Sequence, residues 1–186
     1  VPFADKAFMK KVTDRIIEPT IRGLREEGID YRGFIFIGLI KVNGEPEVIE
    51  YNCRMGDPET EVVLPRLRND LLALFRAVAE RKLDTIQMDI DPRAAATMVV
   101  VSGGYPASYE KGHTISGLDY KTKDSSIFHS GTRIEQGKVL TQGGRVLCVT
   151  SYAETLPEAI RKSIGVLHHI DFEGMYYRQD IGYEFL

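Results

Sequence analysis

The sequence contains few cysteines, no long apolar segment and no marked excess of charge. Its two cysteines, Cys53 and Cys148, lie in apolar, strand-like surroundings and form no close-spaced metal or redox motif, which favours buried reduced thiols. A disulfide would require the fold to bring the pair together. No apolar run approaches the length of a membrane span and no segment resembles a signal peptide, so we expect no membrane partner.

Basic residues are scattered along the chain. The net charge is −3, and the pairs Lys10-Lys11 and Arg161-Lys162 sit in helical patterns that are typical of solvated helix faces. Nucleic-acid-binding domains instead gather Lys and Arg into a patch or stripe. We therefore expect no nucleic-acid partner.

The sequence also lacks a phosphate-binding loop of the G-x-x-x-x-G-K-[ST] type, and Gly103-Gly104 followed by Tyr105-Pro106 does not supply one. It has no internal repeat and no low-complexity tract. With 186 residues, of which 43% are hydrophobic, the chain can bury one sizeable core or two small ones.

A predicted hairpin precedes the most informative part of the chain. Residues 33–42 form a nearly continuous apolar run, Asn43-Gly44 is a tight-turn signal, and residues 47–52 alternate polar and apolar side chains. Since neighbouring side chains of a strand point to opposite faces, Glu50, Asn52 and Arg54 are predicted to share one face with Val48. The other face is predicted to carry residues 49, 51 and 53.

The segment from Glu50 to Thr60, called the signature segment below, combines groups that suit a charged ligand. Glu50 and Asn52 offer hard oxygen ligands on Cα atoms roughly 7 Å apart, which suits a magnesium ion. Arg54 can hold a carboxylate or phosphate, and the turn that begins at Gly56 can present backbone amides to an anion. An edge strand with solvated polar residues explains the same pattern equally well from spacing alone.

The signature segment resembles the metal-binding and substrate-binding signature of the glycinamide ribonucleotide synthetase family, phosphoribosylamine-glycine ligases of the ATP-grasp superfamily. Further motifs resemble this family in the order in which it uses them, so that the resemblance covers essentially the whole chain. These motifs are Ile17-Glu18-Pro19-Thr20, Val63-Leu64-Pro65-Arg66-Leu67, Ser102-Gly103-Gly104-Tyr105-Pro106, Phe128-His129-Ser130-Gly131-Thr132, Thr141-Gln142-Gly143-Gly144-Arg145-Val146-Leu147 and Tyr177-Arg178-Gln179-Asp180-Ile181-Gly182.

The resemblance implies ATP-dependent joining of glycine to 5-phosphoribosylamine through a glycyl phosphate, in purine biosynthesis in the cytoplasm. It implies that Glu50 and Asn52 bind Mg²⁺ or Mn²⁺ and, through it, the ATP phosphates. Arg54 is the implied catalytic residue, which also binds the glycine carboxylate. The implied glycine pocket is formed with Arg54 by Gly56, Asp57, Pro58, Glu59 and Thr60, in which Asp57 or Glu59 receives the ammonium group.

The same resemblance implies that the chain lacks upstream domains of the same polypeptide, which bind phosphoribosylamine and grip the adenine and triphosphate. We therefore expect the chain to be inactive alone. Two alternatives stay open: a related ATP-grasp ligase or carboxylase that uses another acid, and a noncatalytic packing or assembly module.

The predicted fold is α+β. Residues 1–91 are expected to be the C-terminal part of an ATP-grasp domain, with a helix over residues 5–27 that Pro19 kinks or splits, the hairpin, and a second helix over 69–82. Residues 92–186 are expected to form a small antiparallel sheet or partly closed barrel with a C-terminal helix over 155–168. The expected strands of this second domain are 95–102, 113–118, 126–131, 138–141, 144–152 and 175–179.

Overall fold

The computed structural model describes residues 3–185, which form two compact units. Residues 3–56 and 71–87 make up the first unit, and residues 57–70 and 88–185 make up the second. The chain passes from the first unit to the second between Gly56 and Asp57. The signature segment is therefore divided between the two units.

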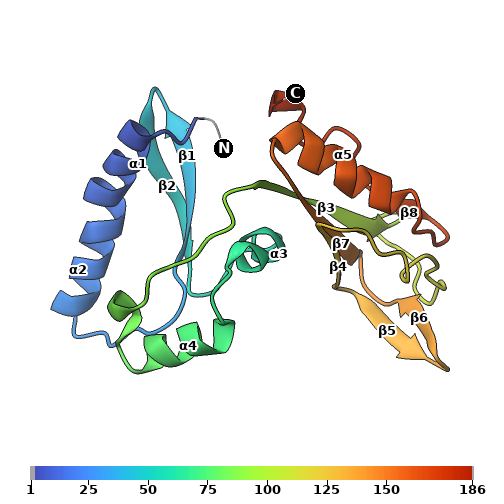
Figure 1. Cartoon of the computed structure of the whole chain (residues 1–186), viewed down its shortest axis with the longest axis horizontal. Helices are drawn as coiled ribbons and strands as arrows, with labels where there is room; N and C mark the ends of the chain where they lie inside the picture. Colours follow the sequence, from blue (N-terminus) through green and yellow to red (C-terminus); the bar gives the residue numbers. More distant parts are fainter. Residues whose placement is uncertain (1–2, 186) are drawn as a thin grey trace. The chain divides into compact units, whose positions relative to one another are not determined.

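A long helical segment opens the first unit. α1 (Lys6–Val12), η1 (Thr13–Ile17) and α2 (Glu18–Glu26) follow one another without a break (Figure 1). Asp5 caps the N-terminus, since its side chain accepts a hydrogen bond from the Phe8 N–H at 2.8 Å. Pro19 has no N–H to give to the carbonyl of Arg15, and η1, a wider π-helical turn, ends two residues before Pro19. The predicted interruption thus takes the form of a π turn within a continuous helical segment.

The predicted hairpin follows as β1 (Phe36–Val42) and β2 (Glu45–Asn52), which pair antiparallel. Asn43 and Gly44 both have positive φ, as a two-residue hairpin turn of this kind requires. The register shifts between Gly38 and Leu39, so the strict alternation predicted through residues 48–50 is not kept. Arg15 of η1 lies 2.6 Å from Glu45, which joins the helical segment to the hairpin.

α4 (Leu71–Ala79) and η3 (Leu83–Thr85) complete the first unit, and α4 is shorter than the predicted helix over 69–82. The ring of Phe75 on α4 meets the ring of Phe34 edge to face, with centroids 6.0 Å apart. Asp30 forms ion pairs with Arg32 and with Arg81, which lies just after α4. These contacts hold α4 beside the segment that leads into β1.

The second unit is built on an open antiparallel sheet with the strand order β4-β7-β3-β8. Its strands are β3 (Ala94–Ser102), β4 (Ser125–His129), β7 (Arg145–Ala153) and β8 (Met175–Tyr176), and a separate hairpin contains β5 (Thr132–Glu135) and β6 (Lys138–Thr141). The predicted small antiparallel sheet is thus confirmed, and it is not closed into a barrel. The predicted strand over 113–118 makes only isolated bridges, and β5 was not predicted.

α5 (Leu156–Leu167) covers one face of this sheet (Figure 1). Thr155 and Glu158 form a capping box at its start. The core between helix and sheet includes Met98, Val100, Leu147, Val149, Ala159, Ile160 and Leu167. The short helix α3 (Thr60–Val63), followed by η2 (Leu64–Arg66), packs on β3 and β7, and η4 (Tyr183–Phe185) ends the described chain.

β7 is buried along almost its entire length. Residues 146–153 are all buried, although neighbouring side chains of a strand point to opposite faces. Both faces are therefore covered, one by α5 and the other by neighbours that include α3. This explains why β7 is an almost continuous run of apolar and small residues rather than an alternating pattern.

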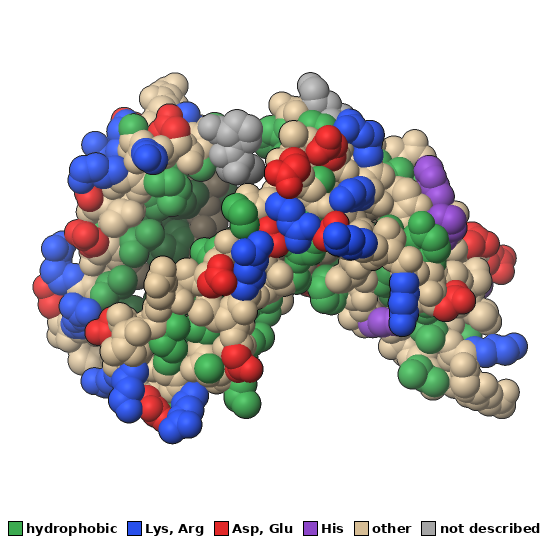
Figure 2. Space-filling view, in the orientation of Figure 1, with side chains coloured by type: hydrophobic (Ala, Val, Ile, Leu, Met, Phe, Trp, Pro, Cys, Tyr) green, Lys and Arg blue, Asp and Glu red, His purple; other side chains and the backbone are tan. Residues whose placement is uncertain are grey.

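Charged side chains are distributed without a single-sign patch in the view of Figure 2, where Lys and Arg are interspersed with Asp and Glu. Within residues 3–185, no helix is both long enough and apolar enough to cross a membrane.

Candidate functional site

Glu50 and Asn52 lie side by side at the end of β2. The Asn52 amide nitrogen donates a hydrogen bond to Glu50 Oε1 at 2.9 Å. This leaves Glu50 Oε2 and Asn52 Oδ1, two hard oxygen ligands on neighbouring side chains of the first unit. Both oxygens are of the kind that Mg²⁺ prefers, so the donor chemistry fits a divalent ion whose other ligands come from a phosphate.

Two neighbours fix the environment of this pair. The hydroxyl of Tyr51 lies 3.1 Å from the Thr20 hydroxyl on α2, so the residue between Glu50 and Asn52 is directed to the helical segment. Gly38 pairs with Glu50 across the hairpin, and a Cβ added to Gly38 would lie 3.0 Å from Glu50 Cγ. A glycine inside an otherwise apolar strand thus leaves room for a carboxylate side chain on the paired strand.

Arg54 is exposed, and its Nη1 donates a hydrogen bond to the carbonyl of Met55 at 2.8 Å. Gly56, the last residue of the signature segment in the first unit, is buried. The first unit therefore carries the predicted metal ligands and the predicted arginine of the site.

The remaining predicted residues belong to the second unit. The Asp57-Pro58 peptide bond is cis, and residues 57–59 form a turn that leads into α3 at Thr60. Asp57 Oδ2 forms an ion pair with Arg145 Nη2 at 2.8 Å. The carbonyl of Glu59 accepts hydrogen bonds from two α3 backbone amides. Arg145, at the start of β7, was not among the predicted site residues.

A second contact holds this turn against the sheet. The hydroxyl of Thr150, a fully buried residue of β7, donates a hydrogen bond to the backbone carbonyl of Glu61 at 2.8 Å. The Thr150 and Thr97 hydroxyl oxygens are 3.0 Å apart on adjacent strands. Two contacts between residues almost 90 positions apart thus attach residues 57–61 to β7.

Beside this contact lies a buried polar group that sequence reasoning also missed. Glu61 Oε2 is buried and has no hydrogen-bond partner within residues 3–185. Cys148 is nearby on β7, where burial, with a smaller contribution from the Glu61 charge, raises the pKa of its thiol to about 11. Both cysteines are free thiols, Cys148 buried as predicted but Cys53 exposed.

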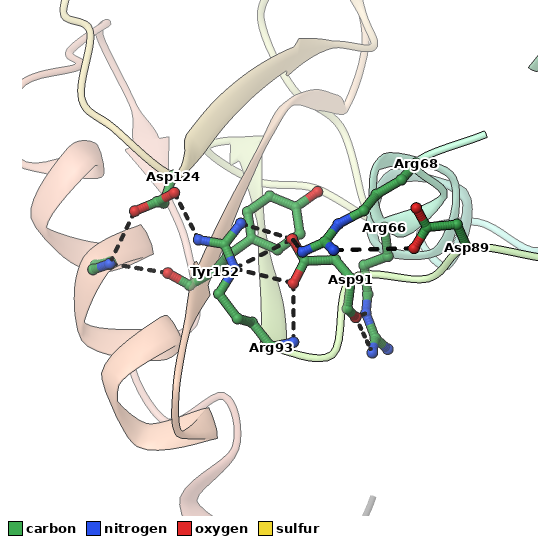
Figure 3. Close-up of polar contacts among 8 residues, drawn as sticks. Arg66, Arg68, Asp89, Asp91, Arg93, Asp124 and Tyr152 are labelled. Carbon is green, nitrogen blue, oxygen red and sulfur yellow. Dashed lines mark hydrogen bonds and ion pairs between the residues drawn. The ribbon is translucent and has the colours of Figure 1, made fainter. Parts of the chain in front are cut away.

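A larger charged cluster lies elsewhere in the second unit and involves Asp91 (Figure 3). The Arg93 guanidinium contacts the Asp91 carboxylate at 2.7 Å and Asp124 at 2.7 Å, and it lies over the ring of Tyr152. Hydrogen bonds from Arg93 hold the pKa of Asp91 well below its usual value of 3.8. Arg66 donates two hydrogen bonds to the Asp91 carbonyl. Because Asp91 and Arg93 neutralise each other, we assign this cluster a structural role.

Within the described part of the chain, no group of three or more His, Cys, Asp or Glu residues is arranged to hold a metal ion. Any divalent ion held by Glu50 and Asn52 would therefore need further ligands besides these two side chains, as an ion that also binds nucleotide phosphates has. Arg178 and Asp180, near the end of the chain, form an ion pair at 2.9 Å.

Two family models match the chain in succession. Residues 1–60 match the ATP-grasp (A) domain of phosphoribosylglycinamide synthetase, and residues 95–184 match the C domain of the same synthetase.

Named relatives agree with these matches. The phosphoribosylamine-glycine ligase of Vibrio vulnificus is 42% identical over 184 residues, which are 98% of this chain and 43% of that protein. The corresponding Synechocystis ligase is 44% identical over 188 residues, covering 100% of this chain and 45% of the relative. The crystal structure of the Thermotoga maritima ligase superposes with a TM-score of 0.77 at 36% identity, over 95% of this chain and 43% of that one.

The chain thus spans less than half the length of these relatives. Three findings point to the same family. Two domain models of one synthetase match consecutive parts of the chain, relatives above 40% identity match along its whole length, and a solved ligase structure superposes on it. The chain belongs to the phosphoribosylglycinamide synthetase family, of which it represents the C-terminal end of the ATP-grasp domain and the C domain.

Proposed function

We propose that the protein to which this chain belongs joins glycine to 5-phosphoribosylamine at the expense of ATP. ATP phosphorylates the glycine carboxylate, and the amine of phosphoribosylamine then attacks the acyl phosphate, which gives glycinamide ribonucleotide, ADP and phosphate. The observation that carries this proposal is the end-to-end similarity of the chain to phosphoribosylamine-glycine ligases.

Glu50 and Asn52 are the proposed ligands of the divalent ion, Mg²⁺ or Mn²⁺, that accompanies ATP. When bound, the ion offsets the charge of the phosphates that approach the glycine carboxylate. The hydrogen bond between the two side chains supports this assignment, because it orients one carboxylate oxygen and one amide oxygen as a pair before any ion arrives.

Arg54 is proposed to hold the glycine carboxylate and to stabilise the charge that develops on the transferring phosphoryl group. Gly56, Asp57, Pro58, Glu59 and Thr60 are proposed to shape the glycine pocket with it. Asp57 is already paired with Arg145 at 2.8 Å, so we assign Glu59 rather than Asp57 as the acceptor of the glycine ammonium group.

The central experiment measures phosphate release by the complete polypeptide that contains this chain, with ATP and with glycine and phosphoribosylamine added separately and together. We expect release only with both. Glu50→Gln and Asn52→Ala should each reduce kcat roughly 100-fold or more and weaken the dependence on Mg²⁺. Glu47→Gln, an exposed glutamate on the same strand, is the matched control and should retain activity. Normal Mg²⁺-dependent turnover in both site variants would remove Glu50 and Asn52 as ligands.

Three further expectations belong to this proposal. The ATP-grasp part of the chain ends near residue 91 and the second domain occupies residues 92–186. The enzyme works in the cytoplasm in purine biosynthesis. The chain alone does not turn over, since the family's phosphoribosylamine and triphosphate contacts lie mostly upstream; activity of the isolated chain equal to that of the complete polypeptide would contradict this.

A further inference from the structure

The turn that contains Asp57 and Glu59 is held by the sheet of the second unit. Arg145 reaches Asp57 from the first residue of β7, and Thr150 reaches the Glu61 carbonyl from the middle of the same strand. The two contacts lie at either end of residues 57–61. The orientation of this turn therefore depends on β7, although β7 lies far from it in the sequence.

The backbone around Arg145 is itself tightly fixed. The carbonyl of Arg145 accepts a hydrogen bond from the Gly131 N–H at 2.9 Å, and the Gly143 N–H donates to the Gly131 carbonyl at 3.0 Å. A Cβ added to Gly131 would lie 2.4 Å from the Arg145 carbonyl oxygen, so the backbone at Gly131 approaches the start of β7 more closely than a side chain would allow. Arg145 thus projects from a rigid support.

The exposure of the Arg145–Asp57 pair indicates what it contributes. The two side chains are 43% and 52% exposed, and ion pairs this accessible add little to folding stability because water and salt screen them. Holding a carboxylate in one orientation needs only a directed contact of this kind. The pair is therefore better suited to orienting the turn than to stabilising the fold.

We propose that Arg145 is a positioning residue for the glycine site. It neutralises Asp57 and fixes the turn, which presents Glu59 and the adjoining backbone to the amino acid substrate. The C domain thereby helps to determine how well the enzyme binds its acid substrate, acting through Asp57 and without touching the substrate. This inference rests on the proposed function.

The test uses the complete polypeptide with Arg145→Gln and Arg145→Lys, and measures KM and kcat separately for glycine and for ATP. Arg145→Gln should lower kcat/KM for glycine roughly 10- to 100-fold, mostly through KM, while KM for ATP stays within about twofold. Arg145→Lys, which keeps the charge, should recover part of this loss. Arg133→Gln is the matched control, because Arg133 pairs with Glu135 at the same distance and similar exposure on β5.

A double-variant cycle adds a readout that general loss of structure would not give. If Arg145 acts through Asp57, Arg145→Gln combined with Asp57→Asn should cost no more than Asp57→Asn alone. Additive losses, equal changes in the glycine and ATP parameters, or no effect of Arg145→Gln would each overturn the inference. If Arg145→Gln does not fold, the same comparisons apply to Arg145→Lys. If phosphate release by the wild-type enzyme did not depend on glycine, the proposed function itself would be refuted.

Discussion

Replacing Thr150 by valine tests how the turn after the signature segment is attached to the sheet. Valine keeps nearly the same shape but removes the hydroxyl, which leaves the Glu61 carbonyl without its donor and the Thr97 hydroxyl without its neighbour. Leaving buried polar groups unsatisfied costs about 1–3 kcal/mol. Thr150 is fully buried, so water does not replace the lost partner without rearrangement.

A loss of about 1.5 kcal/mol, with a urea m-value of about 2 kcal/mol/M, lowers the unfolding midpoint of the second unit by roughly 0.8 M. Because the chain has two units, the unfolding of each is best followed separately by amide hydrogen exchange in urea. The backbone amides of α3 and of β7 are the reporters. In Thr150→Val, exchange at α3 should accelerate more than exchange at β7.

Ser163→Ala is the matched control for this variant. Ser163 is also fully buried, and its hydroxyl donates to the carbonyl of Ala96 at 3.1 Å, but it lies on α5. It should destabilise the second unit by a similar amount without a selective effect on α3. The reasoning fails if Thr150→Val leaves the midpoint unchanged, or if both variants affect α3 equally.

Three further predictions concern other parts of the chain. Iodoacetamide at neutral pH should label exposed Cys53 and spare Cys148, whose thiol pKa is raised to about 11, and mass spectrometry should detect one adduct when folded and two in denaturant. Because the pKa of Asp91 is lowered in the folded state, ionised Asp91 stabilises the fold fully above pH 3.8, and this stabilisation is lost as the pH falls towards the lowered value. The difference in free energy of unfolding between wild type and Asp91→Asn should therefore be constant near neutrality and shrink in acid. A difference that does not change with pH in acid urea titrations would contradict this. Gly131→Ala should lower the free energy of unfolding by about 1–3 kcal/mol, because the added Cβ would contact backbone atoms. Gly165→Ala, with open space in α5, should be neutral or stabilising. Equal melting temperatures of the two variants in thermal melts would be evidence against this packing.

Local chemistry allowed much of the fold to be predicted. The helix start at residue 5, the hairpin turn at Asn43-Gly44 and the helix start at residue 155 each depend on residues close together in the sequence. Each was found at or near its predicted position. The family was predicted for a related reason, since the signature segment is contiguous. The choice between an open sheet and a partly closed barrel needed the structure, because sheet closure depends on the pairing of distant edge strands, which no local pattern encodes.

The sequence by itself determined that Glu50 and Asn52 are neighbours with hard oxygen atoms, because a strand places every second side chain on the same face. Only the tertiary structure decided that Asp57 is paired with Arg145 and that Thr150 holds Glu61. These partners are separated by almost 90 residues. Their contacts arise from the packing of α3 on β7, which follows from burial of β7 on both faces and leaves no periodic trace near either residue.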